Sequence, residues 1–304
     1  MMIWLRQLRH DAKATAVFGA SYFLNKWVRR CPPRHVGPFA VAEEGPLELH
    51  VLTSERDHAM ALWSLCSYYY FSRRADPLRV HDDGTLSTEA IDLFQAFFPG
   101  AQVIRRRDAD AFLAQELRRW PLLAALRQRV PHVMKITDFP AFCRARRFLL
   151  LDSDVLFFDE PRELVEVAEW DTAHVFSEDL TNWYAVDASE VWLRRGFRLA
   201  PRINCGIGNV AKTGCDLARM EAFLRSGLVD IASCPPCIEQ TLYALVAEYE
   251  GYRHLSGSYA VAKGPGTTGL VAKHYVGLVL DRFRTARDYF FSEGVQHLWS
   301  LWAG

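Results

Sequence analysis

The chain has 304 residues, half of them hydrophobic, which is enough to bury a core in one large domain or two small ones. Lysine plus arginine and aspartate plus glutamate each number 36, so the average charge gives no indication of a nucleic-acid-binding protein. No run of about 18 apolar residues occurs, so no membrane-spanning helix is expected.

Residues 1–46 are predicted to form a basic amphipathic helix and a linker. The helix runs from about Arg6 to Val28, and Cys31-Pro32-Pro33 ends it. Residues 1–36 carry seven basic residues and one aspartate, an excess of six positive charges (7 − 1). Two interpretations are open: residues 1–30 make a peripheral contact with an anionic membrane, or the helix packs on the body of the protein.

The cysteines and the N-terminus bear on the compartment. Seven cysteines are an odd number without regular spacing, which argues against a secreted disulfide framework. Charges interrupt the apolar residues at the N-terminus, so a signal peptide is not expected. We therefore expect a cytoplasmic protein, located at the inner face of the membrane if its N-terminal helix binds lipid.

A regular alternation of strands and helices begins at residue 47, where the predicted catalytic domain (47–304) starts. The predicted strands of this part are Leu47–Thr53, Leu78–His81, Gln102–Ile104 and Phe148–Leu151. The predicted helices are Arg56–Phe71, Ser87–Phe97, several stretches up to about Val130, and Thr137–Arg144. This order is typical of an α/β fold with a doubly wound, mainly parallel sheet. Ligands of such sheets bind at the carboxyl ends of the strands, where Thr53, Ser54 and Asp152 fall.

The second half of the chain is less regular. Strands are predicted at Thr172–Phe176, Arg202–Val210 and Val271–Tyr275, and helices at Cys215–Arg225 and Cys237–Glu248. The aromatic C-terminal end is predicted to be helical.

Asp152-Ser153-Asp154 lies between two apolar runs, Leu149–Leu151 and Val155–Phe158. Buried carboxylates are costly unless they are paired or hold a metal, and hard oxygen ligands suit Mg²⁺ or Mn²⁺. One alternative is a turn in which the aspartates cap backbone groups. Another is a haloacid-dehalogenase-like phosphatase with Asp152 as nucleophile, although such enzymes carry a threonine two residues after the second aspartate, where Leu156 stands.

Three further segments bear polar groups that could act with these carboxylates. His274, at a predicted strand end, could be a third metal ligand that favours Mn²⁺, or a structural histidine. Asn204 and Gly206 could approach a ligand closely, or form a turn or bulge. Glu239 and Gln240 open a predicted helix, where they could cap it or bind sugar hydroxyls.

In this order and spacing, the chain resembles the GT-A nucleotide-sugar glycosyltransferases, and within them the family-eight enzymes related to glycogenin. The resemblance runs from about Leu49 to Gly277. It implies a Rossmann-like, mixed but mainly parallel sheet flanked by helices. It also implies transfer of a sugar, with retention, from a nucleotide-diphosphate sugar such as a UDP-sugar.

The resemblance further implies roles for individual residues. It makes Asp152, Asp154 and His274 the ligands of Mn²⁺ or Mg²⁺, and Lys135 and Gly206 donor contacts. Asn204 and the pair Glu239-Gln240 would act on the sugar; the family has Asp-Gln at the latter position. Thr53, Ser54 and Ser153 are expected on the donor side. The family's lysine six residues after the histidine is replaced by Leu280, so Arg282 or Arg284 is expected to supply that charge.

The resemblance leaves several properties open. The acceptor could be a glycan, a lipid-linked sugar or a protein. An inverting enzyme would need a general base, for which Glu178 and Asp179 are candidates. A protein that binds a nucleotide sugar without catalysis is a further alternative, and it predicts donor binding without turnover.

Overall fold

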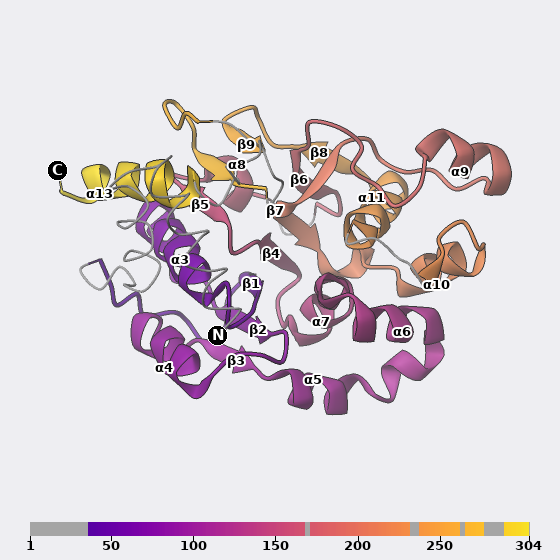
Figure 1. The fold of residues 1–304 in the computed structure, drawn as a ribbon, viewed down its shortest axis with the longest axis horizontal. Coiled ribbons are helices and arrows are strands. Elements are labelled where there is room, and N and C mark those ends of the chain that lie inside the picture. Colours follow the sequence, from indigo (N-terminus) through magenta and orange to yellow (C-terminus); the bar gives the residue numbers. More distant parts are fainter. Residues whose placement is uncertain (1–35, 168–170, 232–236, 262–264, 277–288, 304) are drawn as a thin grey trace, which may run out of the picture.

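A computed structural model describes residues 36–167, 171–231, 237–261, 265–276 and 289–303. A seven-stranded sheet with the order β3-β2-β1-β4-β7-β6-β8 forms its centre, and a three-stranded sheet, β5-β10-β9, lies beside it (Figure 1). The predicted N-terminal helix lies outside the described residues, so both interpretations of it stay predictions. Within the described residues, no helix combines the length and the apolar character that crossing a membrane requires.

The first half of the chain builds the parallel part of the large sheet. Its strands are β1 (Leu47–Thr53), β2 (Leu78–Asp82), β3 (Gln102–Ile104) and β4 (Arg147–Leu151). Strand β1 pairs in parallel with both β2 and β4, and β2 pairs in parallel with β3. These strands are buried apart from β3. Because they run parallel to one another, their carboxyl ends meet at one edge of the sheet.

Helices connect these strands. They are α3 (His58–Ser72), α4 (Thr88–Phe97), α5 (Arg106–Leu113), α6 (Pro121–Arg129) and α7 (Met134–Phe142), with short 3₁₀ turns at Glu116–Arg119 and Pro131–Val133. Helix α4 begins where Ser87 Oγ accepts a hydrogen bond from the backbone of Ala90, as an N-cap does. Helix α7 begins three residues before the predicted Thr137, so Lys135 lies in its first turn.

The second half adds one strand in the opposite direction. Strand β7 (Ile203–Ala211) pairs antiparallel with β4 and with β6 (His174–Glu178), and β6 pairs in parallel with β8 (Tyr252–His254). Because β7 is antiparallel to β4, β7 begins at the edge where β4 ends. Strand β6 starts two residues later than predicted and includes Glu178, since Glu178 pairs with Ile203.

The helices of this half are α8 (Arg162–Val165), α9 (Ala188–Arg195), α10 (Leu217–Arg225) and α11 (Ile238–Glu250), with a 3₁₀ turn at Lys212–Gly214. Helix α11 begins beside β7 and carries Glu239 and Gln240 in its first turn, as the sequence predicts. Helix α9, which the sequence analysis did not predict, buries one side chain, that of Val191.

The small sheet joins the middle of the chain to its end. Strand β10 (Ala272–His274) pairs antiparallel with β5 (Val155–Phe157) and in parallel with β9 (Tyr259–Val261). The C-terminal helical segments η5 (Phe290–Val295) and α13 (Gln296–Ala303) pack against this sheet and α3. Lys273 Nζ lies 2.9 Å from Glu293 Oε1, which ties β10 to η5.

The large sheet also contains a buried ionic group. Glu48, in β1, accepts hydrogen bonds from the backbone N–H groups of Arg144 and Ala145 at 2.8 and 3.0 Å, and from Arg79 Nε at 3.1 Å. Both charged side chains are at most 1 % exposed. Glu48 is satisfied because donors from a neighbouring strand and a loop converge on it, and this explains a charged side chain within a buried strand.

Taken together, the architecture confirms the predicted α/β class and the mixed, mainly parallel sheet flanked by helices.

Candidate metal and substrate site

Two carboxylates and one imidazole converge between the two sheets. Asp152 and Asp154 lie in the turn between β4 and β5, and His274 is the last residue of β10. One potential ligand atom from each residue lies within 4.8 Å of the other two. His274 Nε2 is 3.1 Å from Asp154 Oδ1 and 3.7 Å from Asp152 Oδ2. Two hard oxygens and one imidazole nitrogen form a donor set that fits Mn²⁺ or Mg²⁺.

The pairing of β10 with β5 explains how residues so distant in sequence meet. His274 is the register partner of Val155, which follows Asp154 directly. The backbone N–H of Tyr275 then donates to the carbonyl of Asp154 at 2.8 Å. These contacts place the imidazole beside the aspartate turn.

The other side of the His274 ring is fixed by β7. Its Nδ1 lies 2.8 Å from Asn204 Oδ1, so Nδ1 carries the proton that this amide oxygen accepts, and Nε2 faces the carboxylates. A Cβ atom at Gly206 would lie 2.2 Å from His274 Nδ1, so only glycine leaves room for the ring. Burial lowers the pKa of His274, but the Asp154 carboxylate outweighs burial and raises the pKa above its ordinary value.

Lys135 extends from α7 into the same site. Its ammonium forms a close ion pair with Asp152 and a second one, at 3.1 Å, with Glu239 Oε1. The side chain is only 2 % exposed. Burial alone would lower the pKa of Lys135, but the Asp152 and Glu239 carboxylates outweigh it and raise the pKa. Lys135 therefore stays charged and links the metal-binding candidates to α11.

Glu239 lies deeper than the aspartates. Burial raises its pKa to about 7, against the opposing effect of the Lys135 ammonium. Burial thus makes the Glu239 carboxylate harder to ionise, and the Lys135 ammonium partly offsets this effect. Perturbation of this kind is common at functional sites.

Two amide side chains meet at Asp179, which follows β6. Asp179 Oδ2 accepts hydrogen bonds from Asn204 Nδ2 at 2.9 Å and from Gln240 Nε2 at 3.2 Å. Gln240 Nε2 also lies 3.2 Å from the carbonyl of Trp183. From the sequence, Asp179 is predicted only as a candidate base for an inverting reaction; in the structure it accepts hydrogen bonds from both predicted sugar-binding amides.

A cavity of about 210 Å³ opens beside the aspartate turn, at the carboxyl ends of β1 and β2. Its walls are Leu52, Thr53, Ser54, Asp57, Met60, Asp83, Pro131, His132, Lys135, Asp152, Ser153 and Asp154. Thr53, Ser54, Ser153 and Lys135, which the sequence predicts on the donor side, thus line one cavity. Ser153 Oγ donates to the Leu52 carbonyl at 3.3 Å, which holds the turn against β1.

Sequence reasoning missed the polar residues Asp57, Asp83 and His132 of this cavity. Asp83 follows the end of β2, so the rule that ligands bind at carboxyl ends could have found it. Asp57 directly precedes α3, and His132 lies in the 3₁₀ turn Pro131–Val133 before α7. Neither residue belongs to a recognisable sequence motif. Arg282 and Arg284 lie outside the described residues.

No protein-family model matches the chain, and no curated protein matches its sequence. Solved structures do match its fold. The galactosyltransferase LgtC in complex with donor and acceptor sugar analogs is 13% identical, with a TM-score of 0.53 over 81% of this chain and 95% of that one. An active-site mutant of LgtC is 12% identical, with a TM-score of 0.54 over 83% and 95%.

The WbbM bifunctional glycosyltransferase is 11% identical, with a TM-score of 0.51 over 77% of this chain and 46% of that one. Identities this low carry information about fold and not about substrate. The chain therefore has the GT-A glycosyltransferase fold that its sequence motifs imply.

Proposed function

We propose that this protein is a metal-dependent glycosyltransferase that moves a sugar from a nucleotide-diphosphate sugar to an acceptor. Among such donors, we propose a UDP-sugar. The observation that carries the proposal is the convergence of Asp152, Asp154 and His274 beside a cavity at the ligand edge of a GT-A fold. One fold can host several activities, so the function follows from the residues of the site.

Asp152, Asp154 and His274 are the residues that would hold Mn²⁺ or Mg²⁺. The atoms are close enough together, the Gly206 gap admits the imidazole, and the donor types suit either ion. A bound cation would supply Lewis-acid stabilisation of the charge on the departing nucleoside diphosphate.

The chain's own groups would position the donor. Lys135 places a buried positive charge in the wall of the cavity, where it favours phosphate oxygens. Thr53, Ser54 and Ser153 offer hydroxyl groups along the cavity wall, and Thr53 Oγ1 is buried without a hydrogen-bond partner among the described residues. This unpaired hydroxyl supports a polar ligand at that wall.

A second group of residues would orient the transferred sugar. Asn204 and Gln240 both donate a hydrogen bond to Asp179 Oδ2, so the positions of their two amide groups are fixed relative to each other. Glu239 lies beside Lys135 and could contribute a hydrogen bond in either protonation state. Accurate positioning of this kind can supply a large share of the reduction in barrier.

We propose retention of the anomeric configuration, as the resemblance implies. The role of Asp179 as the acceptor for two amides supports this proposal, because a general base would need a carboxylate that faces the acceptor hydroxyl. NMR of the anomeric proton of the product tests it, and an inverted product would make Asp179 or Glu178 the candidate base.

The activity is tested with a panel of nucleotide sugars, by following slow hydrolysis with Mn²⁺, with Mg²⁺ or with EDTA. We expect turnover of one donor that EDTA abolishes and that Asp154→Asn reduces strongly. Asp159→Asn is the matched control, because this exposed aspartate lies five residues away and outside the site. An unchanged rate for Asp154→Asn rules the proposal out.

The same panel separates the alternatives. Metal-dependent release of phosphate from simple monoesters would point to a phosphatase in which Asp152 is the nucleophile. Donor binding without any turnover would point to a non-catalytic nucleotide-sugar-binding protein.

A further inference from the structure

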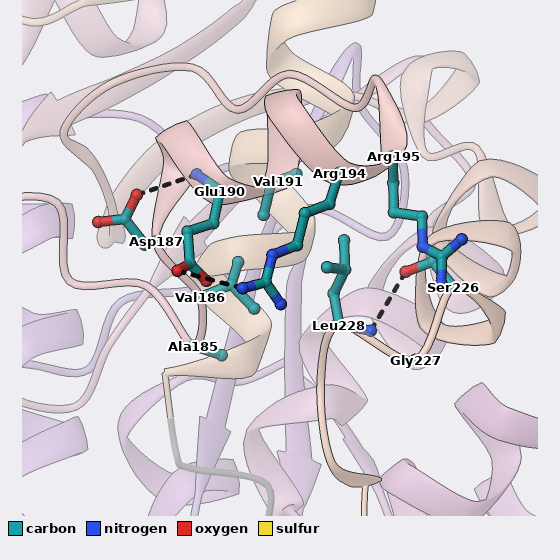
Figure 2. A pocket seen from close by; sticks show the side chains of 10 residues that line it. All are labelled: Ala185, Val186, Asp187, Glu190, Val191, Arg194, Arg195, Ser226, Gly227 and Leu228. Atoms are coloured by element: carbon teal, nitrogen blue, oxygen red, sulfur yellow. Dashed lines mark hydrogen bonds and ion pairs between the residues drawn. The ribbon is translucent and has the colours of Figure 1, made fainter.

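A cavity of about 620 Å³ lies between α9 and the turn that follows α10 (Figure 2). The residues that line it are Ala185, Val186, Asp187, Glu190, Val191, Arg194, Arg195, Ser226, Gly227 and Leu228. Its volume falls in the range of pockets that bind small molecules, and charged and hydroxyl groups make up much of its wall. The roles proposed above for the GT-A site leave this cavity unexplained.

The cavity adjoins the residues proposed to orient the sugar. Ala185, in its wall, donates its N–H to Thr241 Oγ1 at 2.8 Å, and Thr241 directly follows Gln240 in α11. Two residues before Ala185, the Trp183 carbonyl contacts Gln240. Two residues of extended chain span at most about 7 Å. The distance from Trp183 to the start of the cavity wall is therefore no more than about the length of one sugar unit.

Both carboxylates of the cavity wall already have partners. Asp187 caps α9 and accepts hydrogen bonds from the backbone of Ser189 and Glu190 at 2.8 and 3.1 Å. Glu190 pairs with Arg194 at 3.6 Å (Figure 2). The Asp187 carboxylate is therefore held at the start of α9, and the Glu190 carboxylate is paired with a neighbouring arginine.

Arg195 differs from these groups. Its side chain extends from α9 on the same side of the cavity as the turn with Ser226 (Figure 2). Within the described parts of the chain, the structure shows no ion pair or hydrogen bond of its guanidinium group. A Cβ atom at Gly227, the next residue of that turn, would meet nothing within 4 Å, so this end of the cavity is open. A guanidinium fork beside a hydroxyl suits an anionic group with several oxygens.

We infer that this cavity binds an anionic substituent, a carboxylate or a phosphate, of the acceptor glycan. The inference rests on the proposed function and names the class of its acceptor. Trp183, which is 50% exposed, precedes the cavity wall by two residues and contacts Gln240 through its backbone carbonyl, and an exposed indole can stack on the apolar face of a sugar ring. The acceptor is thus an acidic sugar whose charge sits at Arg195 while its hydroxyl reaches the donor.

Binding of four probes tests the inference by ligand-observed NMR titration of the full chain. The probes are methyl glucoside, methyl glucuronide, glucose 6-phosphate and inorganic phosphate. We expect at least one of the two anionic sugars to bind about tenfold more tightly than methyl glucoside, since a charge-assisted hydrogen bond contributes that much. Glucuronide and glucose 6-phosphate distinguish a carboxylate from a phosphate. Arg195→Gln should remove the difference, and Arg118→Gln, which changes an exposed arginine outside the cavity, should keep it.

Three results would overturn the inference: equal affinities for the neutral and the anionic sugars, an unchanged preference in Arg195→Gln, or inorganic phosphate binding as tightly as glucose 6-phosphate. Absence of binding by every sugar also overturns it. Mn²⁺-dependent binding of nucleotide sugars is measured on the same samples. If donor binding persists while the anionic sugars fail, only this inference is wrong; if no donor binds, the proposed function fails as well.

Discussion

The Tyr243 hydroxyl donates a hydrogen bond of 2.8 Å to the backbone carbonyl of Lys135. Tyr243 lies on α11, one turn after Glu239, and Lys135 lies on α7. The bond therefore joins the two helices whose side chains meet in the Lys135–Glu239 ion pair.

Tyr243→Phe removes this bond and leaves the ring in place. We expect the free energy of unfolding to fall by about 1 kcal/mol, the usual contribution of one buried hydrogen bond. Urea denaturation measures the change. Tyr249→Phe, on the same helix but 42% exposed, is the control and should lie within error of the unchanged protein. Equal effects of the two changes would show that the bond contributes nothing.

Gly206→Ala is expected to displace His274. The added Cβ would lie 2.2 Å from His274 Nδ1, so the ring must leave its position between Asn204 and the aspartates. Loss of a correctly oriented ligand lowers metal affinity by about tenfold to a hundredfold. Electron paramagnetic resonance of free Mn²⁺ gives the dissociation constant. Gly257→Ala, where a Cβ meets nothing within 4 Å, should bind Mn²⁺ as the unchanged protein does.

Acid should destabilise the protein through His174. Burial, followed by the charge of Arg147, lowers the pKa of this histidine from its ordinary 6.5 to about 4. The unfolded chain takes up a proton below pH 6.5 and the folded chain does not. Stability is therefore fully present above pH 6.5 and is lost as the pH falls toward 4. A difference of about 2.5 pKa units corresponds to about 3 kcal/mol.

The measurement compares the protein with His174→Gln by urea denaturation at several pH values. The stability difference between the two should shift in favour of the variant by about 3 kcal/mol from pH 7 to pH 4. A difference that does not vary with pH would contradict the assignment of this titration to His174.

Glu48→Ala should be strongly destabilising. It leaves the Arg79 guanidinium, which is 1 % exposed, without its carboxylate, and it removes the acceptor of two backbone N–H groups. Breaking a buried pair from one side costs about 3–5 kcal/mol. The double variant Glu48→Ala with Arg79→Met should recover part of this loss, because no buried charge remains unpaired. Strictly additive losses, again from urea denaturation, would show that the pair is not coupled.

The sequence predicts the parallel half of the fold well because its elements are long and strongly patterned. Strand Leu47–Thr53 has the predicted bounds, and the helix that carries Glu239 begins within a residue of its predicted start. The second half is harder to predict. Strand β10 lies inside the predicted strand Val271–Tyr275, but β8 and β9, with three residues each, are too short for an alternating pattern to be recognised.

The candidate site also contains residues that the sequence predicts and contacts that it does not. Lys135, Asp152, Asn204, Glu239 and His274 carry recognisable motifs, and the structure brings them together. The contacts of Asp179 depend on pairing between β6 and β7 and on the position of α11, which single-sequence patterns do not contain. Arg195 and its cavity belong to α9, a short helix with one buried residue and therefore a weak pattern.

Neighbouring side chains of a strand point to opposite faces, and in β10 this alternation separates two very different groups. His274 faces the aspartates, whereas Lys273 faces Glu293 and the Gly266 carbonyl, both at 2.9 Å. A shift of one residue in the three-residue pairing with β5 would exchange them and place an ammonium group where a cation should bind. The C-terminal segment η5 provides none of the three candidate metal ligands. Through the ion pair of Glu293 with Lys273, it nevertheless stabilises the strand register in which His274 faces the aspartates.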